Sequence, residues 1–409
     1  MKRIVFLATV FLSLFGFFTL VYQADIVNAQ AKPLRIGVTL PLNVSMGLEA
    51  KKCFDVLVPD FNAKGGMTID GIKYQIEMII YDDGMRADKG RAAMERLVHN
   101  DKVRFVVGQL ASAPTVAALS VTEPEKVIVF TGAASNKLLE AENHYTVRTS
   151  NLSTAMPGQR AYMLKKYPHI KTQVYVGPDD DTGYDVNKQD DRICEKLGIK
   201  KLGSNFIPRD TRDFTSIALK ITNLNPDLVY SSGLNQGVET GSLLKALYQA
   251  GYKGIKLGVP PDMDVIKGLA SKETMEGYLA VFRDGSETPT PMAPAKHLRE
   301  LYTAKYGSWN DTGVMWVGAW YAFLEVMKKA NSFDPDKIMA AMEKLEFDTP
   351  QGHFILVKRP DMGVKRYCDT VADIHMGMIR NSKFEYVDTL QTQEGVAVCE
   401  KVYGGGNWR

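Results

Sequence analysis

Two acidic clusters are the residues in this sequence best suited to chemistry. Asp82 and Asp83 follow one predicted strand, and three aspartates at 179–181 follow another. Adjacent carboxylates can act as a general acid and base, or they can bind a cation. Acidic loops at the ends of sheets are also common without such a role, so an ordinary solvated loop is the alternative. Both clusters are candidate sites that need support from elsewhere in the sequence.

Further catalytic signatures are absent from the sequence. It contains no Gly-x-Ser-x-Gly elbow, no Walker A loop, no His-Glu-x-x-His and no Gly-x-Gly-x-x-Gly after a strand. The six histidines show no metal-ligand spacing: His99, His144, His169, His297, His353 and His375. This pattern favours binding over catalysis, and we expect neither a metal nor a cofactor.

Short apolar runs alternate with amphipathic stretches along the chain. Strands are predicted at 34–40, 74–81, 103–107, 127–130, 173–177, 204–207, 227–230 and 255–259. Helical stretches of about ten to fifteen residues separate most of them, which implies right-handed crossovers and parallel sheets covered on both faces. Helices are predicted at 293–306, 314–330 and 335–345, and a strand-like tail follows residue 354. We expect an α/β protein whose ligands bind beyond the carboxyl ends of the strands.

The composition is that of an ordinary globular protein. The chain has 409 residues, of which 45% are hydrophobic, and a formal net charge of +3. So small an excess of positive charge gives no reason to expect a nucleic-acid partner. Length alone suggests two or three domains.

The N-terminus has the three-part pattern of a secretory signal peptide. Lys2 and Arg3 precede an apolar run at 4–21, and small residues follow at Ala29 and Ala31. We predict cleavage near one of these alanines, and therefore a periplasmic protein. An uncleaved anchor is the alternative, because a run of this length could cross the bilayer core of roughly 30 Å.

An ordered set of short segments carries a family resemblance. The segments are RIGVTLP at 35–41, NAKGG at 62–66, YDD at 81–83, VVG at 106–108, TGAAS at 131–135, DFT at 213–215 and PDLVY at 226–230. Together they resemble the type I periplasmic solute-binding proteins of ABC importers, in the branch for branched-chain amino acids, amides and aromatic acids.

The resemblance implies two open, doubly wound lobes with parallel sheets, joined by a three-crossover hinge. Ligand would bind between the lobes, which close around it. Residues 32–149 and 283–345 would form lobe 1, and residues 150–282 and 346–409 would form lobe 2.

The resemblance also assigns the ligand carboxylate to two loops. Ser112, preceded by Ala111, falls on the position whose hydroxyl and backbone amide hold the carboxylate. A helix start with an early proline follows Ser112, where free N–H groups favour an anion. The alternative is that Ser112 only caps this helix. Gly132 and Ala134 fall on the second loop, where small residues let the backbone approach the ligand; the alternative is a plain turn.

The residues aligned with the ammonium site differ from those of the amino-acid binders. Ala134 replaces a threonine that helps to hold the ammonium, and Leu234, next to Asn235, replaces an aromatic residue. A buried ammonium needs an anionic or polar partner. Asp262 is the only acidic candidate in the aligned loop, and a solvated turn carboxylate is the alternative.

Other pocket positions are also less aromatic than in those relatives. Thr182 stands where a stacking aromatic residue often lies, with Tyr184 nearby, and Met46 occupies the position of another aromatic residue. These departures predict a more apolar pocket, suited to a small carboxylate that is aliphatic or aromatic.

The cysteines depart from the family as well. The disulfide of the amino-acid binders is missing, because the aligned positions hold Met85 and Ala111. Cys368 and Cys399 both lie in the strand-like tail of an exported protein, and we predict that they pair, adding about 3–4 kcal/mol of stability. Buried free thiols are the alternative for this pair. Cys53 and Cys194 are expected to be unpaired.

The resemblance therefore implies a binding protein that delivers a small carboxylate to an ABC permease and its ATPase subunits. A soluble ligand-sensing subunit is the second possibility, and an enzyme that uses the acidic loops is the third. The expected partners are the small-molecule ligand and the importer, and the chain is expected to be a monomer.

Overall fold

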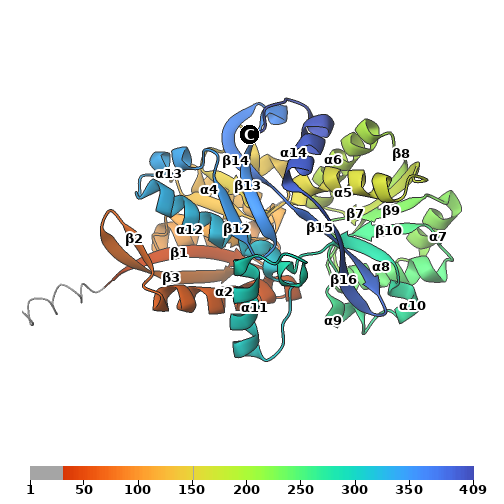
Figure 1. The fold of residues 1–409 in the computed structure, drawn as a ribbon, viewed down its shortest axis with the longest axis horizontal. Helices are drawn as coiled ribbons and strands as arrows, with labels where there is room; N and C mark the ends of the chain where they lie inside the picture. The colour runs from red at the N-terminus through yellow and green to blue at the C-terminus, as the bar shows by residue number, and fades with distance from the viewer. Residues whose placement is uncertain (1–30, 151) are drawn as a thin grey trace, which may run out of the picture.

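A computed structural model of the chain describes residues 31–150 and 152–409. The predicted signal peptide, apart from Ala31, lies outside the described residues. Within them, no helix combines the length and the apolar character needed to cross a membrane. Two large sheets and one small sheet, covered by helices, make up this part of the chain (Figure 1).

The first sheet has the order β2-β3-β1-β4-β5-β6 and is parallel except for the β2–β3 hairpin. Its strands are β1 (Lys32–Leu40), β2 (Met67–Ile69), β3 (Ile72–Asp82), β4 (Phe105–Gln109), β5 (Ile128–Thr131) and β6 (Thr146–Arg148). The connecting helices are α2 (Ser45–Ala63), α3 (Ala87–Glu95), which continues as a π-helical turn (Arg96–Asn100), and α4 (Ser112–Thr122); a 3-10 turn (Asn136–Leu139) precedes β6. Because helices cover both faces, β4 and β5 are buried along their whole length.

The second sheet has the order β16-β15-β11-β10-β9-β7-β8. Its strands are β7 (Thr172–Pro178), β8 (Lys200–Ile207), β9 (Leu228–Ser231), β10 (Ile255–Gly258), β11 (Tyr278–Val281), β15 (Ile374–Arg380) and β16 (Lys383–Leu390). Its helices are α5 (Leu152–Lys166), α6 (Asp181–Leu197), α7 (Thr215–Leu224), α8 (Val238–Gln249), α9 (Met263–Ile266), α10 (Lys272–Met275) and α14 (Thr392–Tyr403). The strands β7 to β11 are parallel, whereas β15 and β16 extend the sheet antiparallel.

The small third sheet lies between the two large ones. It comprises β12 (Glu346–Thr349), β13 (Gly352–Arg359) and β14 (Val364–Ala372), paired antiparallel. Successive side chains of a strand point to opposite faces. Phe354 and Leu356 accordingly pack into the core of the first sheet, and Ile355 and Val357 pack into the core of the second. Figure 1 shows these strands between the two halves of the molecule.

The chain passes between the two large sheets three times. It crosses after β6 and returns after β11 to three helices whose apolar faces join the core of the first sheet. These are α11 (Ala293–Tyr306), α12 (Gly318–Ala330) and α13 (Pro335–Ala341). Short 3-10 turns lie at Gly285–Glu287, Val314–Trp316 and Pro360–Met362. The chain then reaches the second sheet again through β12 to β14, so a two-lobed α/β fold with three crossovers is confirmed.

The C-terminal region differs from the sequence prediction in two respects. The tail is not strand-like to its end, because α14 buries Gly395, Cys399 and Val402, which have helical spacing. The predicted disulfide is also wrong. Cys368 lies on β14 and Cys399 on α14, in different apolar clusters, and both thiols are free and buried. The same is true of Cys53 and Cys194, so the prediction that these two are unpaired is confirmed.

Candidate functional site

A cavity lies between the two large sheets, where the carboxyl ends of their strands meet. Its volume is about 120 Å³, close to the roughly 150 Å³ of a cavity that accepts benzene. The first half of the chain and the η turn before α12 contribute Met46, Met85, Leu110, Ala111, Ser112, Ala134, Met315 and Trp316. The second sheet and its helices contribute Met156, Gln159, Thr182, Val186, Arg209, Tyr230, Ser232, Gly233, Leu234, Gln236, Gly258, Val259, Pro260 and Val281. The lining is mainly apolar and is sized for a single ring or a short branched chain.

The N-terminus of α4 supplies hydrogen-bond donors to this cavity. The helix begins at Ser112, which is only 2% exposed, and the preceding Ala111 has an extended backbone. The first hydrogen bond of the helix runs from the Thr115 N–H to the Ala111 carbonyl at 3.3 Å. The N–H groups of the first turn are therefore free of helical partners and favour an anion. The N-cap position is held by Ala111, and the Ser112 Oγ accepts from Ser135 instead of from an N–H of α4, so the alternative that Ser112 only caps the helix is wrong.

The second loop, at residues 132–135, is tied to the first. The Ser135 N–H donates to the Ser112 Oγ at 3.1 Å. A hydroxyl group that accepts from one side keeps its own proton free to donate on another. The Ser112 hydroxyl can therefore donate to a ligand, while Ala134, one residue before Ser135, lines the cavity.

Arg209 is the charged side chain of the cavity. Its Nη1 donates to the Gly233 carbonyl at 2.7 Å, and its Nη2 lies 2.7 Å from the Asp180 Oδ2. Asp180 lies outside the lining, and no aspartate or glutamate of the described residues lines the cavity. The charged side chain of the described lining is therefore a guanidinium that is already paired with Asp180 behind it.

Three further polar side chains face the same space. Gln159 is 7% exposed, and its amide has no hydrogen-bond partner in the described part of the chain. The Trp316 Nε1 is buried and likewise lacks a partner there. Gln236 accepts from the Arg283 Nη1 at 3.1 Å. Two groups, one amide and one indole N–H, are thus left for a ligand.

The structure brings six of the ten predicted contact residues to the cavity: Met46, Ala111, Ser112, Ala134, Thr182 and Leu234. Three of the other four have local roles outside its lining. The backbone of Gly132 lies directly behind the Trp316 ring. Tyr184 is 50% exposed and donates to Asp179. Asn235 accepts from the Gly237 N–H at 2.8 Å at the start of α8.

Asp262 is neither in the cavity lining nor a solvated turn residue. It is 2% exposed, caps α9 through the Val265 N–H, and accepts from the Ser45 hydroxyl at 2.6 Å. Ser45 begins α2 of the first half of the chain, so this bond joins the two halves. The expectation of a solvated carboxylate is wrong because the Ser45 hydroxyl closes over it.

Other bonds also join the two halves around the cavity. Lys137 donates to the Asp181 Oδ1 at 3.0 Å, and Ser135 donates to Asp185. With the bond between Ser45 and Asp262, they hold the two halves together on more than one side of the cavity. The described conformation is therefore a closed one.

Several lining residues were not predicted from the sequence, although some of them could have been. Arg209 and Ser232 follow β8 and β9 directly, so the rule that ligands bind beyond strand ends could have found them. Trp316 and Met315 fell inside a predicted helix at 314–330, but the chain forms a 3-10 turn there and α12 starts at Gly318. Nothing in the sequence signals that turn.

The acidic clusters have structural roles. The Asp82 Oδ1 accepts from the Leu42 N–H at 2.9 Å, and the Asp180 Oδ1 accepts from the Gly183 N–H at the start of α6. Asp180 also pairs with Arg209. The described residues contain no group of histidine, cysteine and acidic side chains arranged to hold a metal.

Asp83 is buried beside the cavity with an unusual protonation equilibrium. Its Oδ1 accepts from the N–H of Met85, a lining residue, at 2.9 Å, while its Oδ2 is buried without a partner. Burial, followed by the negative charge of Asp82, raises the pKa of Asp83 from 3.8 to about 6. The native state therefore holds this proton more tightly than the unfolded state does. Its contribution to stability is fully present below about pH 4 and is lost as the pH rises through 6.

Asp83→Asn is accordingly expected to stabilise the protein at pH 8, by roughly 1–3 kcal/mol, because the amide keeps the bond to Met85 without a buried charge. At pH 4 the gain should vanish. Thermal unfolding of the two proteins at both pH values measures the difference, and the exposed Asp70 in the β2–β3 turn provides the control variant Asp70→Asn. An equal change in Tm at both pH values would contradict the prediction.

Comparisons with known proteins agree with this architecture. The family described as periplasmic binding protein matches residues 33–365. A leucine-, isoleucine-, valine-, threonine- and alanine-binding protein of Pseudomonas aeruginosa is 25% identical over 334 residues, which is 79% of this chain and 84% of that protein.

Two solved structures have the same fold. A leucine-binding protein from Thermotoga maritima has a TM-score of 0.73 at 20% identity, covering 88% of this chain and 99% of its own. A solute-binding protein from Rhodopseudomonas palustris, in complex with p-hydroxybenzoic acid, has a TM-score of 0.73 at 18% identity, covering 90% of this chain and all of its own.

Proposed function

The chain belongs to the periplasmic binding protein family, and on that premise we propose that it captures a small, mainly apolar carboxylate and delivers it to an ABC permease. The ligand class that we propose is a benzoate-type or short branched aliphatic acid without an ammonium group. The protein would act as a monomer outside the cytoplasmic membrane, after removal of the signal peptide. Residues 32–149 with 283–345, and 150–282 with 346–409, would be the two lobes that close on the ligand.

The distribution of charge around the cavity carries this proposal. The donors at the N-terminus of α4, which are the Ser112 hydroxyl and the first N–H groups of the helix, favour an anion. Arg209, which is paired with Asp180, is the charged side chain of the described lining. No acidic side chain of the described residues lines the cavity to receive an ammonium. Burying an unpaired ammonium is costly, so the lining favours an acid over the corresponding amino acid.

The relatives support a ligand that carries a carboxylate, but they differ in whether that ligand also carries an ammonium group. The Pseudomonas aeruginosa and Thermotoga maritima proteins are named for amino acids, and the Rhodopseudomonas palustris structure holds p-hydroxybenzoic acid. All of these ligands carry a carboxylate. The small, mostly apolar cavity accommodates either a ring or a branched chain, so the ammonium is the feature that discriminates between the two classes.

A thermal-shift screen of the mature chain tests the proposal. The ligands are benzoate, 4-hydroxybenzoate, 4-methylpentanoate and leucine, with benzamide as the neutral counterpart of benzoate. A ligand present at 100 times its Kd should stabilise the protein by about 2.7 kcal/mol. We expect an acid without an ammonium to give the largest shift and benzamide to give almost none. A larger shift with leucine than with any of the acids would contradict the proposed ligand class.

A further inference from the structure

The peptide between Ala134 and Ser135 is held from both sides. Its carbonyl oxygen accepts from the Arg148 Nη1 at 2.8 Å and from the Ser153 Oγ at 2.9 Å. Its N–H donates to the Ser112 Oγ at 3.1 Å. A carbonyl oxygen has two lone pairs, so this one has no capacity left for a ligand.

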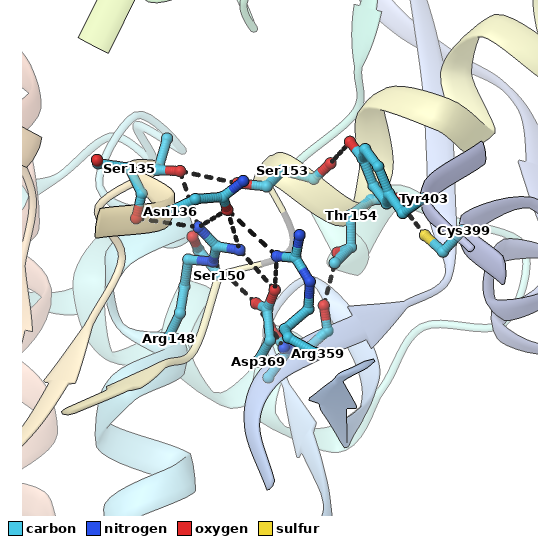
Figure 2. Close-up of polar contacts among 12 residues, drawn as sticks. Ser135, Asn136, Arg148, Ser150, Ser153, Thr154, Arg359, Asp369, Cys399 and Tyr403 are labelled. Carbon is cyan, nitrogen blue, oxygen red and sulfur yellow. Dashed lines mark hydrogen bonds and ion pairs between the residues drawn. The ribbon is translucent and has the colours of Figure 1, made fainter. Parts of the chain in front are cut away.

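Two neighbouring carbonyls of the same loop each accept one bond from the same segment of the chain. The Gly132 carbonyl accepts from the Ser150 Oγ at 2.7 Å, and the Ser135 carbonyl accepts from the Arg148 Nη1 at 3.3 Å. All of these side-chain donors come from the start of the first crossover between the sheets, at 148–153. Figure 2 shows Arg148, Ser150 and Ser153 gathered at the Ser135–Asn136 turn.

Arg148 is itself fixed by a buried ion cluster. Its Nε donates to the Asp369 Oδ1 at 2.8 Å, and the Arg359 Nη1 donates to the Oδ2 of the same carboxylate at 2.8 Å (Figure 2). All three side chains are at most 1% exposed. Burial alone would raise the pKa of Asp369, but the two guanidinium groups lower it below its ordinary value. The cluster stays ionised, and the guanidinium of Arg148 keeps its direction toward the loop.

The result is a loop in which three carbonyls accept bonds from the crossover while one N–H has no partner among the described residues. The Ala134 N–H has no hydrogen-bond partner in the described chain, whereas the carbonyls of Gly132, Ala134 and Ser135 are engaged by the crossover. Ser112 accepts from this loop, which leaves its hydroxyl proton to point elsewhere. An ammonium group placed beside the ligand carboxylate would find the Ala134 carbonyl, which belongs to a lining residue, already occupied by two donors.

We propose that Arg148 and Ser153 are positioning residues that make the site reject α-amino acids in favour of the matching acids. The inference rests on the proposed function, since it explains how the same cavity discriminates against an ammonium. These residues act through the Ala134–Ser135 peptide, because neither of them lines the cavity. The selectivity for acids over amino acids is thus set by residues of the first crossover, which lie behind the loop.

The test uses two pairs of ligands, and the members of each pair differ only in the ammonium group. The first pair is 4-methylpentanoate and leucine, and the second is phenylacetate and phenylglycine. Calorimetric Kd values are measured for the wild type, Ser153→Ala and Arg148→Lys. Ser153→Ala vacates one lone pair of the Ala134 carbonyl, and Arg148→Lys keeps the charge beside Asp369 but loses the planar fork. We expect the wild type to favour the acids by about 100-fold, and each variant to reduce that ratio about 5- to 10-fold.

Arg359→Lys is the matched control. Arg359 is equally buried and also pairs with Asp369; its other bonds go to Asp361 and to the Asn136 side chain, and none goes to a backbone carbonyl of the loop. We expect this variant to lower Tm as Arg148→Lys does and to leave the ratio of Kd values unchanged.

A uniform loss of affinity for acid and amino acid in Ser153→Ala and Arg148→Lys would overturn the positioning role. If Arg148→Lys does not fold, Ser153→Ala still decides the question, because it leaves the ion cluster intact. Failure of the proposed function gives a different result: the wild type would bind leucine more tightly than 4-methylpentanoate, or it would bind neither member of either pair.

Discussion

Ser112→Ala is expected to weaken binding of the tightest carboxylate ligand by about 10- to 100-fold, because a hydrogen bond to a charged group contributes about 1.5–3 kcal/mol. Two effects add here. The variant removes the hydroxyl donor at the N-terminus of α4, and it leaves the Ser135 N–H without its acceptor at 3.1 Å. Isothermal titration with the best ligand of the screen measures the loss.

Ser120→Ala is the control for a general effect on α4. Ser120 lies on the exposed side of the same helix, where its Oγ donates to the Ala117 carbonyl at 3.1 Å. Its replacement should leave the Kd within a factor of about two, since surface substitutions usually change stability by less than 0.5 kcal/mol. If Ser112→Ala bound the ligand as tightly as Ser120→Ala, the carboxylate would have to lie elsewhere in the cavity.

Gly132→Ala should reduce both affinity and stability, although Gly132 does not line the cavity. A Cβ at this position would lie 2.5 Å from the Trp316 Cδ1 and 3.2 Å from its Nε1. The indole ring would have to move into a cavity of only about 120 Å³. Overpacking of this kind costs about 1–3 kcal/mol of stability, and we expect a loss of affinity of at least about 10-fold. Thermal unfolding and titration of the same preparation measure the two effects.

Gly203→Ala provides the comparison. Gly203 lies in β8, and a Cβ there would meet no atom within 4 Å. This variant is expected to change neither Tm nor Kd. An affinity for Gly132→Ala equal to that of Gly203→Ala would mean that Trp316 can shift without narrowing the site.

Most of the strands and helices up to β10 could be predicted because each core strand is a short apolar run, whereas the three-residue strands β2 and β6 were missed. Buried strands such as β4 and β5 leave an uninterrupted pattern, and the helices between them are amphipathic. The loops that form the cavity follow from the same order, since ligands bind beyond the carboxyl ends of parallel strands. Ser112 and Ala134 were assigned within these loops by the family resemblance, and both line the cavity.

The remaining features depend on contacts distant in the sequence. The burial of Asp262 depends on Ser45, which is 217 positions earlier in the chain. The carboxylate of Asp369 is paired with Arg148, which is 221 positions earlier in the chain. Local pattern cannot reveal such pairs. It could have revealed α14, whose buried residues recur with helical spacing, and hence that Cys399 is not on a strand beside Cys368.

The small third sheet also affects how the protein folds. Phe347, Phe354 and Leu356 belong to the same core as the N-terminal strand β1, while alternate residues of β13 belong to the other core. Contacts between segments so far apart in sequence form late and slow the folding of a chain. Each core therefore lacks part of its packing until residues 346–372 are present, and we expect the two lobes to complete their folding together.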